Sequence, residues 1–108
     1  MKDELLQIFP TPLLITKYKG SLEQELKQID TLDWIEQKQN GNFKSKDTYL
    51  LDNEQFKNIK NFIYESINKF SKDILQSDQR LVVTQCWLNK NPKGSKHHEH
   101  VHPNSIIS

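Results

Sequence analysis

A regular stripe of apolar residues runs through the middle of this 108-residue chain and predicts a long amphipathic helix. Its members recur at three- and four-residue spacing: Phe56, Ile59, Phe62, Ile63, Ile67, Phe70 and Ile74. Such spacing places the side chains on one face of an α-helix. Asp52 precedes the stripe, and Gln55 stands three residues after Asp52, as in a capping box. We expect this helix to cover a sheet of its own domain rather than a partner or a membrane surface.

Two elements are predicted before the stripe. Residues 7–18 form an extended apolar run that predicts a strand, and its first half contains prolines, which are tolerated at strand starts and sheet edges. Ser21 and Gln24 have the spacing of another capping box. They predict a modest helix over 21–38, which ends in a turn-rich loop at 39–42.

The C-terminal third of the chain predicts strands. Residues 80–89 are rich in β-branched and aromatic side chains, and a turn follows at 91–94. The last residues, roughly 98–108, have the pattern of the first half of another strand. A sheet made only of these segments and the N-terminal run would leave long unpaired edges. We therefore expect the sequence to be the N-terminal part of a longer protein.

Charge and hydropathy exclude several classes of protein. The chain has 15 basic and 14 acidic residues, a balance that argues against a general binder of nucleic acid or anionic membranes. No apolar run approaches the roughly 18 residues of a membrane span, and no signal peptide is evident. The single cysteine, Cys86, rules out an internal disulfide and is compatible with a reducing compartment. We expect a cytoplasmic protein.

A histidine cluster is the clearest chemical signal. All four histidines lie within six positions, at His97, His98, His100 and His102. On a strand His100 and His102 would point the same way, and two neutral imidazoles form half of a site for Fe(II), Zn(II), Mn(II) or Cu(II). A third ligand must come from elsewhere, and the candidates are Cys86 and Glu99, although Glu99 has the opposite strand parity. The alternative is a solvated histidine-rich loop that binds metals adventitiously.

Five runs of residues resemble a known protein family. The runs Trp87–Asn89, Asn91–Gly94 and His97–Ser108 are similar to its central motif, of which His-x-His-Pro-Asn-Ser is the most specific part. The runs Ile8–Pro12 and Tyr49–Asp52 resemble its opening strand and the residues before its long helix. The family is that of 2-oxoglutarate/Fe(II)-dependent oxygenases found in marine bacteria and phages.

The resemblance implies a fold and a pair of ligands. The expected fold is α+β: the N-terminal portion of a double-stranded β-helix, of jelly-roll or cupin-like type, with two helices packed on the sheet. Residues 1–108 would be one incomplete domain, with the N-terminal strand and supporting helices in 1–80 and the first barrel strands with the metal motif in 81–108. His100 occupies the family's first-ligand position, and His102 stands where the family has a carboxylate.

The resemblance also implies an activity. Fe(II) would be the cofactor and 2-oxoglutarate the small-molecule co-substrate of a dioxygenase that hydroxylates a C–H bond and releases succinate and CO₂. The family's distal histidine and the basic residue that holds the co-substrate lie beyond this motif, and Arg80, the only arginine, precedes it. We therefore expect the 108 residues alone to be inactive.

Two other functions compete with the oxygenase hypothesis. One is a non-enzymatic cupin-like metal-binding or interaction module that closes its sheet as a homo-oligomer. The glutamate of the plain cupin pattern is absent, because Ile106 and Ile107 stand at its expected position. The other is a relic without function.

Overall fold

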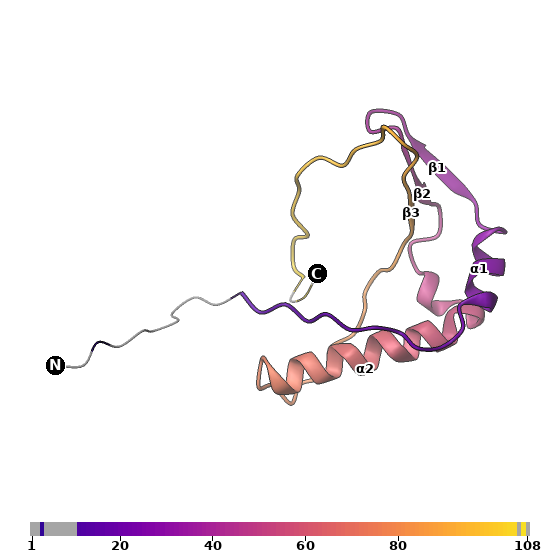
Figure 1. The fold of residues 1–108 in the computed structure, drawn as a ribbon. Helices are drawn as coiled ribbons and strands as arrows, with labels where there is room; N and C mark the ends of the chain where they lie inside the picture. Colours follow the sequence, from indigo (N-terminus) through magenta and orange to yellow (C-terminus); the bar gives the residue numbers. More distant parts are fainter. Residues whose placement is uncertain (1–2, 4–10, 106, 108) are drawn as a thin grey trace.

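The chain is an α+β protein with two helices and a small antiparallel sheet (Figure 1). The computed structural model describes residue 3, residues 11–105 and residue 107. The elements in chain order are α1 (Glu23–Ile29), β1 (Trp34–Gln37), β2 (Asn42–Ser45), the 3₁₀ turns η1 (Leu50–Asp52) and η2 (Glu54–Phe56), α2 (Lys57–Asp73) and β3 (Asn89–Lys90). Neither helix in the described part of the chain combines the length and the apolar character that crossing a membrane requires.

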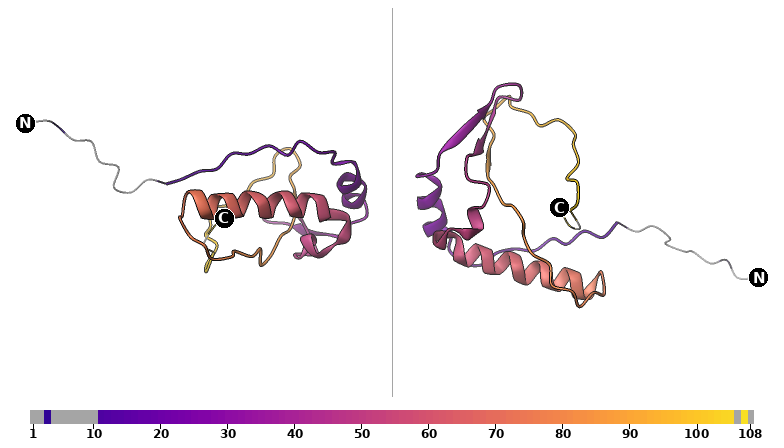
Figure 2. Two further views of the ribbon diagram at one scale, coloured as in Figure 1. Left: turned by 90° about the horizontal axis from the view of Figure 1, so that it is seen from below. Right: turned by 180° about the vertical axis from the view of Figure 1, so that it is seen from behind.

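The predicted N-terminal strand falls partly on residues that the structure does not describe. Its first residues, 7–10, lie outside the described residues. So does most of the run Ile8–Pro12, which resembles the opening strand of the family. Residues 11–18 are described and form no strand. They run alongside α2 (Figures 1 and 2), where the Tyr18 and Phe62 rings lie 5.2 Å apart between centroids.

The long helix is confirmed, but it begins later than its sequence pattern suggested. Residues 50–56 form the two 3₁₀ turns, and α2 starts at Lys57. The predicted cap at Asp52 is wrong: Asn53 caps η2, where its side chain accepts a hydrogen bond of 2.9 Å from the Gln55 N–H, and Phe56, the residue before α2, makes no side-chain cap. The 3₁₀ turns tighten the chain ahead of the helix and direct two leucines inward.

The hydrophobic core is small and centres on the two 3₁₀ turns. Its buried members are Leu50, Leu51 and Phe56. Half-buried residues from every neighbouring segment surround them: Ile29, Leu32, Ile59, Ile63, Val83, Cys86 and Leu88. The two helices therefore meet η1 and η2, and the sheet stands over one end of α2 (Figures 1 and 2). This corrects the expectation that both helices would pack on the sheet.

The predicted helix over 21–38 is wrong in its second half. The helix α1 ends at Ile29, and a β-hairpin of β1 and β2 follows it. The residues after Ile29 are Asp, Thr, Leu, Asp, Trp and Ile, which favour turns and strands more than helix. The turn between the strands uses Gly41 at φ +71°, a conformation that glycine adopts without steric cost.

The C-terminal third contains less strand than the sequence predicted. The strand expected over 80–89 is reduced to β3 and to one parallel bridge between Tyr49 and Cys86. The turn at 91–94 is confirmed, with the Ser95 N–H donating to the Pro92 carbonyl at 3.0 Å. The strand expected over 98–108 is not formed by the described residues 98–105 and 107. Ile106 and Ser108 lie outside the described residues.

Candidate metal centre

The sheet has two different faces. Strand β3 pairs with β2 through Phe43 with Lys90 and through Lys44 with Asn89. Because side chains alternate along a strand, this register defines a histidine face and a core face. The histidine face carries Asn42, Lys44, Trp87, Asn89 and Asn91. The core face carries Trp34, Phe43, Ser45, Leu88 and Lys90.

His97 is a structural residue, separate from the other histidines. Its Nε2 lies 2.9 Å from Asn42 Nδ2 and 2.9 Å from Asn91 Oδ1. Depending on its tautomer, this nitrogen accepts from Asn42 or donates to Asn91, so either form of the ring keeps a partner. Asn42 is fully buried, and the Lys96 N–H donates to the Asn40 carbonyl beside it at 2.9 Å. These bonds fix the start of the histidine segment, residues 97–102, to the hairpin.

Replacing Asn42 with alanine should therefore destabilise the fold by about 0.5–1.5 kcal/mol, the usual net worth of a lost hydrogen bond, because its partners His97 and Asn91 are exposed and can bond to water instead. Urea unfolding would measure the loss, and faster hydrogen exchange at the Lys96 amide would show that the anchor itself has opened. Asn89→Ala is the matched control, because Asn89 is an exposed asparagine on the same face. Equal losses in the two variants would contradict the anchoring role.

His100 and His102 form the candidate metal-binding pair. Their Nε2 atoms face each other at 3.1 Å. The His100 Nδ1–H donates to the His98 carbonyl at 2.9 Å, which leaves the lone pair of His100 on Nε2. A backbone partner on the far nitrogen is the usual way in which a metal-binding imidazole is oriented. The two Nε2 atoms thus lie next to each other, joined by a hydrogen bond in the metal-free chain.

The separation of the two nitrogens fits adjacent positions on one metal ion. With metal–nitrogen distances of about 2.05 Å, nitrogens 3.1 Å apart subtend an angle of about 98°. That angle lies between the octahedral and tetrahedral values, so the pair suits two neighbouring coordination positions. Among the residues that the structure describes, no three His, Cys, Asp or Glu side chains come together as a metal-binding group. The candidate third ligands Cys86 and Glu99 therefore do not complete the site here.

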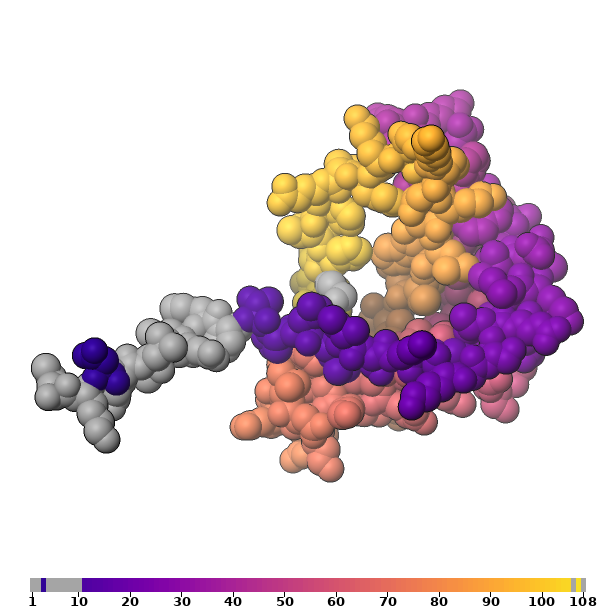
Figure 3. All heavy atoms as spheres, viewed as in Figure 1, coloured from indigo at the N-terminus to yellow at the C-terminus, as the bar shows by residue number. Residues whose placement is uncertain are grey.

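The pair lies on an exposed segment. His98, Glu99, His100 and His102 are all exposed, and residues 98–102 form no helix or strand. The space-filling view shows this yellow segment joined to the sheet near its start, with an opening between the two at the centre of the view (Figure 3). The two-residue spacing places the two imidazoles together although residues 98–102 form no strand, and the turn of this segment follows them at 103–104.

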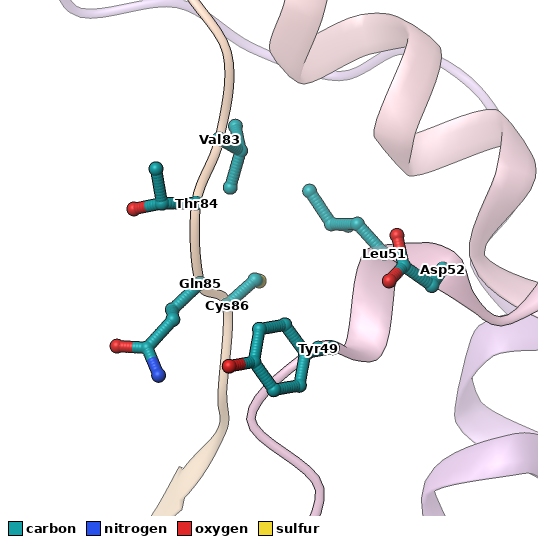
Figure 4. Close-up of a pocket in the computed structure, with 7 residues that line it drawn as sticks. All are labelled: Tyr49, Leu51, Asp52, Val83, Thr84, Gln85 and Cys86. Atoms are coloured by element: carbon teal, nitrogen blue, oxygen red, sulfur yellow. The ribbon is translucent and has the colours of Figure 1, made fainter.

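Cys86 lies apart from the histidines and lines a cavity of about 60 Å³ (Figure 4). Val83 and Cys86 point into this cavity toward Leu51, whereas Thr84 and Gln85 point away from it. Val83 and Cys86, three residues apart, thus point to one side, which the regular alternation of a strand would not allow. Burial raises the pKa of the Cys86 thiol. Cys86 thus serves as a small residue packed against the core and not as an activated nucleophile.

Cys86 should consequently react slowly with an aromatic disulfide reagent near pH 8, because its raised pKa leaves less thiolate than an exposed cysteine has. The same chain in urea is the control and should react faster. The folded thiol holds its proton to higher pH than the unfolded one. Stability should therefore be unaffected at neutral pH and should fall as the pH rises from the unfolded pKa through the folded pKa. Equal rates with and without urea would contradict the burial.

The chain matches no protein-family model, no curated protein and no solved structure. Its site is therefore described by its own residues. Sequence reasoning placed His100 and His102 together correctly but missed the roles of Asn42 and Trp87. The sequence contained one indication of the role of Asn42. Asn42 opens β2 and Asn91 follows β3, and two asparagines at such positions can form a hydrogen bond across paired strands.

Proposed function

We propose that this chain is the N-terminal part of a 2-oxoglutarate/Fe(II)-dependent dioxygenase of hydroxylase type, built on a double-stranded β-helix. The observation that carries the proposal is the pair of Nε2 atoms 3.1 Å apart on His100 and His102. The resemblance of residues 87–108 to the family's central motif supports iron as the metal. Imidazole pairs at this spacing also suit zinc, manganese and copper.

In the proposed site, His100 and His102 hold Fe(II) in two adjacent positions. When bound, the ion would activate O₂, the oxidant, which would hydroxylate a C–H bond while 2-oxoglutarate is oxidised to succinate and CO₂. The His98 carbonyl keeps the His100 ring in the tautomer that can ligate. Among the described residues no third His, Cys, Asp or Glu joins the pair, and in the proposed site the remaining positions would take the co-substrate and O₂. We assign the third ligand and the group that binds the co-substrate carboxylate to sequence outside this chain.

An anaerobic titration tests the proposal. The tag-free chain is titrated with Fe(II) and then with 2-oxoglutarate, while visible absorption is recorded. We expect one Fe(II) per chain and a new charge-transfer band that appears only when both are present. Succinate in place of 2-oxoglutarate is the control, because it lacks the keto group needed to chelate the metal. Binding of Fe(II) without any effect of 2-oxoglutarate, both in this chain and in a chain extended by the sequence assigned to hold the third ligand and the co-substrate group, would rule out the oxygenase.

A second candidate function is a non-enzymatic cupin-like metal-binding or interaction module. The observation that favours it is the exposure of the pair together with a donor set of only two imidazoles. This function predicts that Zn(II) binds more tightly than Fe(II), as simple nitrogen ligands do, and that 2-oxoglutarate changes the binding of neither. It also predicts a homo-oligomer whose mass in sedimentation rises with protein concentration.

A further inference from the structure

Trp87 stacks against one member of the histidine pair. The centroids of the Trp87 and His102 rings are 6.0 Å apart, and the ring planes are inclined by only 14°. This is within the range in which aromatic pairs attract each other in an offset-stacked arrangement. Trp87 is half-buried on the histidine face of the sheet, whereas His102 is exposed. The sheet thus offers a fixed surface on which an otherwise exposed imidazole rests.

The indole itself is held in place by a neighbour on β2. Lys44 places its ammonium 4.7 Å from the centroid of the Trp87 ring, a cation–π contact. Lys44 belongs to a paired strand, so the indole is tied to the most regular part of the sheet. His102, by contrast, lies on a segment without helix or strand, and its ring contacts are with Trp87 and His100.

We propose that Trp87 is a positioning residue for the metal-binding pair, and this inference rests on the metal site proposed above. An imidazole on an irregular segment can rotate away from its partner, and that lost freedom opposes metal binding. Stacking on the indole reduces this freedom before the metal arrives, because the ring already lies with Nε2 toward His100. Pre-organisation of a ligand in this way raises affinity without a new bond to the metal.

The position of Trp87 also makes it a reporter of the site. The chain has two tryptophans, and they lie on opposite faces of the sheet. Trp34 is on the core face, where the Lys90 ammonium sits 4.6 Å from its ring. A paramagnetic ion bound at His100 and His102 should therefore quench Trp87 strongly and Trp34 weakly. Trp34→Phe leaves Trp87 as the only tryptophan, and Trp87→Phe leaves Trp34.

The test uses Co(II) as the probe and the tag-free chain. We expect Co(II) to quench the Trp34→Phe variant saturably and the Trp87→Phe variant only slightly. In equilibrium dialysis, Trp87→Leu should bind Co(II) about threefold to tenfold more weakly than the unaltered chain, while Trp87→Phe, which keeps an aromatic face, should bind within about twofold. The visible spectrum of bound Co(II) should change in Trp87→Leu and stay the same in Trp87→Phe. Equal quenching of the two tryptophans, or equal affinities of the leucine and phenylalanine variants, would overturn the inference.

A metal-free measurement separates this inference from the proposed function. The indole should shift the NMR signals of the His102 ring protons upfield, and Trp87→Leu should abolish that shift while leaving the His98 ring signals unchanged. Loss of the shift together with wild-type Co(II) affinity would refute the positioning role and leave the metal site standing. A normal shift in a chain that binds no Co(II) would instead refute the metal site. Circular dichroism and the signals of the Phe43 ring would show that each variant keeps its fold.

Discussion

Replacing His100 with alanine is expected to lower the affinity of the chain for Co(II) by more than about tenfold, the least that even altered outer-shell partners commonly cost. The reason is geometric, because both Nε2 atoms contribute to one chelate and neither side chain binds well alone. Competitive equilibrium dialysis of the tag-free protein measures the effect. His102→Ala should lower the affinity for Co(II) by a similar factor, because both imidazoles bind the same ion.

His98→Ala is the matched control for these variants. His98 is an exposed histidine two residues away, but it serves the pair through its backbone carbonyl, which alanine retains. Its removal should leave the affinity for Co(II) within about threefold of the original. Should His98→Ala weaken binding as much as His100→Ala, the metal would be bound by the tract as a whole, as any histidine-rich loop binds it.

Leu50→Ala is expected to have the largest effect on stability, about 2–5 kcal/mol, which is usual for removing a buried leucine. Leu50 retains only 2% of its surface exposed and belongs to the buried cluster against which residues of both helices and of the 83–88 segment pack. The core has just three buried hydrophobic residues among those described, so its neighbours have little capacity to fill the cavity. Urea unfolding followed by tryptophan fluorescence measures the loss.

Leu13→Ala provides the comparison for the core prediction. Leu13 is also a leucine, but 81% of its surface is exposed, and its replacement should change stability by less than about 0.5 kcal/mol. Similar losses in the two variants would mean that the described core is not the one that holds the chain together. A small loss in Leu50→Ala alone would mean that the 3₁₀ turns tolerate a void.

The sequence predicted best where many residues repeat one signal. The stripe from Phe56 to Ile74 identified α2 because its members share one helical periodicity, so the prediction did not depend on any single residue. The hairpin of β1 and β2 was missed because each strand has only four residues, too few for a periodic pattern. A capping box at Ser21 marked where a helix begins but gave no information about where it ends.

The candidate site was predicted in part for a similar reason. Histidine spacing predicted that His100 and His102 lie together, and their rings meet although the segment forms no strand. The separation of His97 from the other three depends on Asn42, which lies 55 residues earlier in the chain. Contacts of this kind depend on the register of β2 with β3, and local sequence patterns do not specify that register. The role of Trp87 depends on the same register.

Successive side chains point to opposite faces of the sheet, so the number of residues near β3 matters as much as their identity. Trp87 faces the histidines and Leu88, the next residue, faces the core. Deleting or inserting one residue between Leu88 and the turn at 91–94 would exchange these directions, since each step along a strand reverses the side chain. A leucine would then lie beneath His102 and an indole in the core. We expect natural variation here to substitute residues freely at exposed positions but to preserve their number.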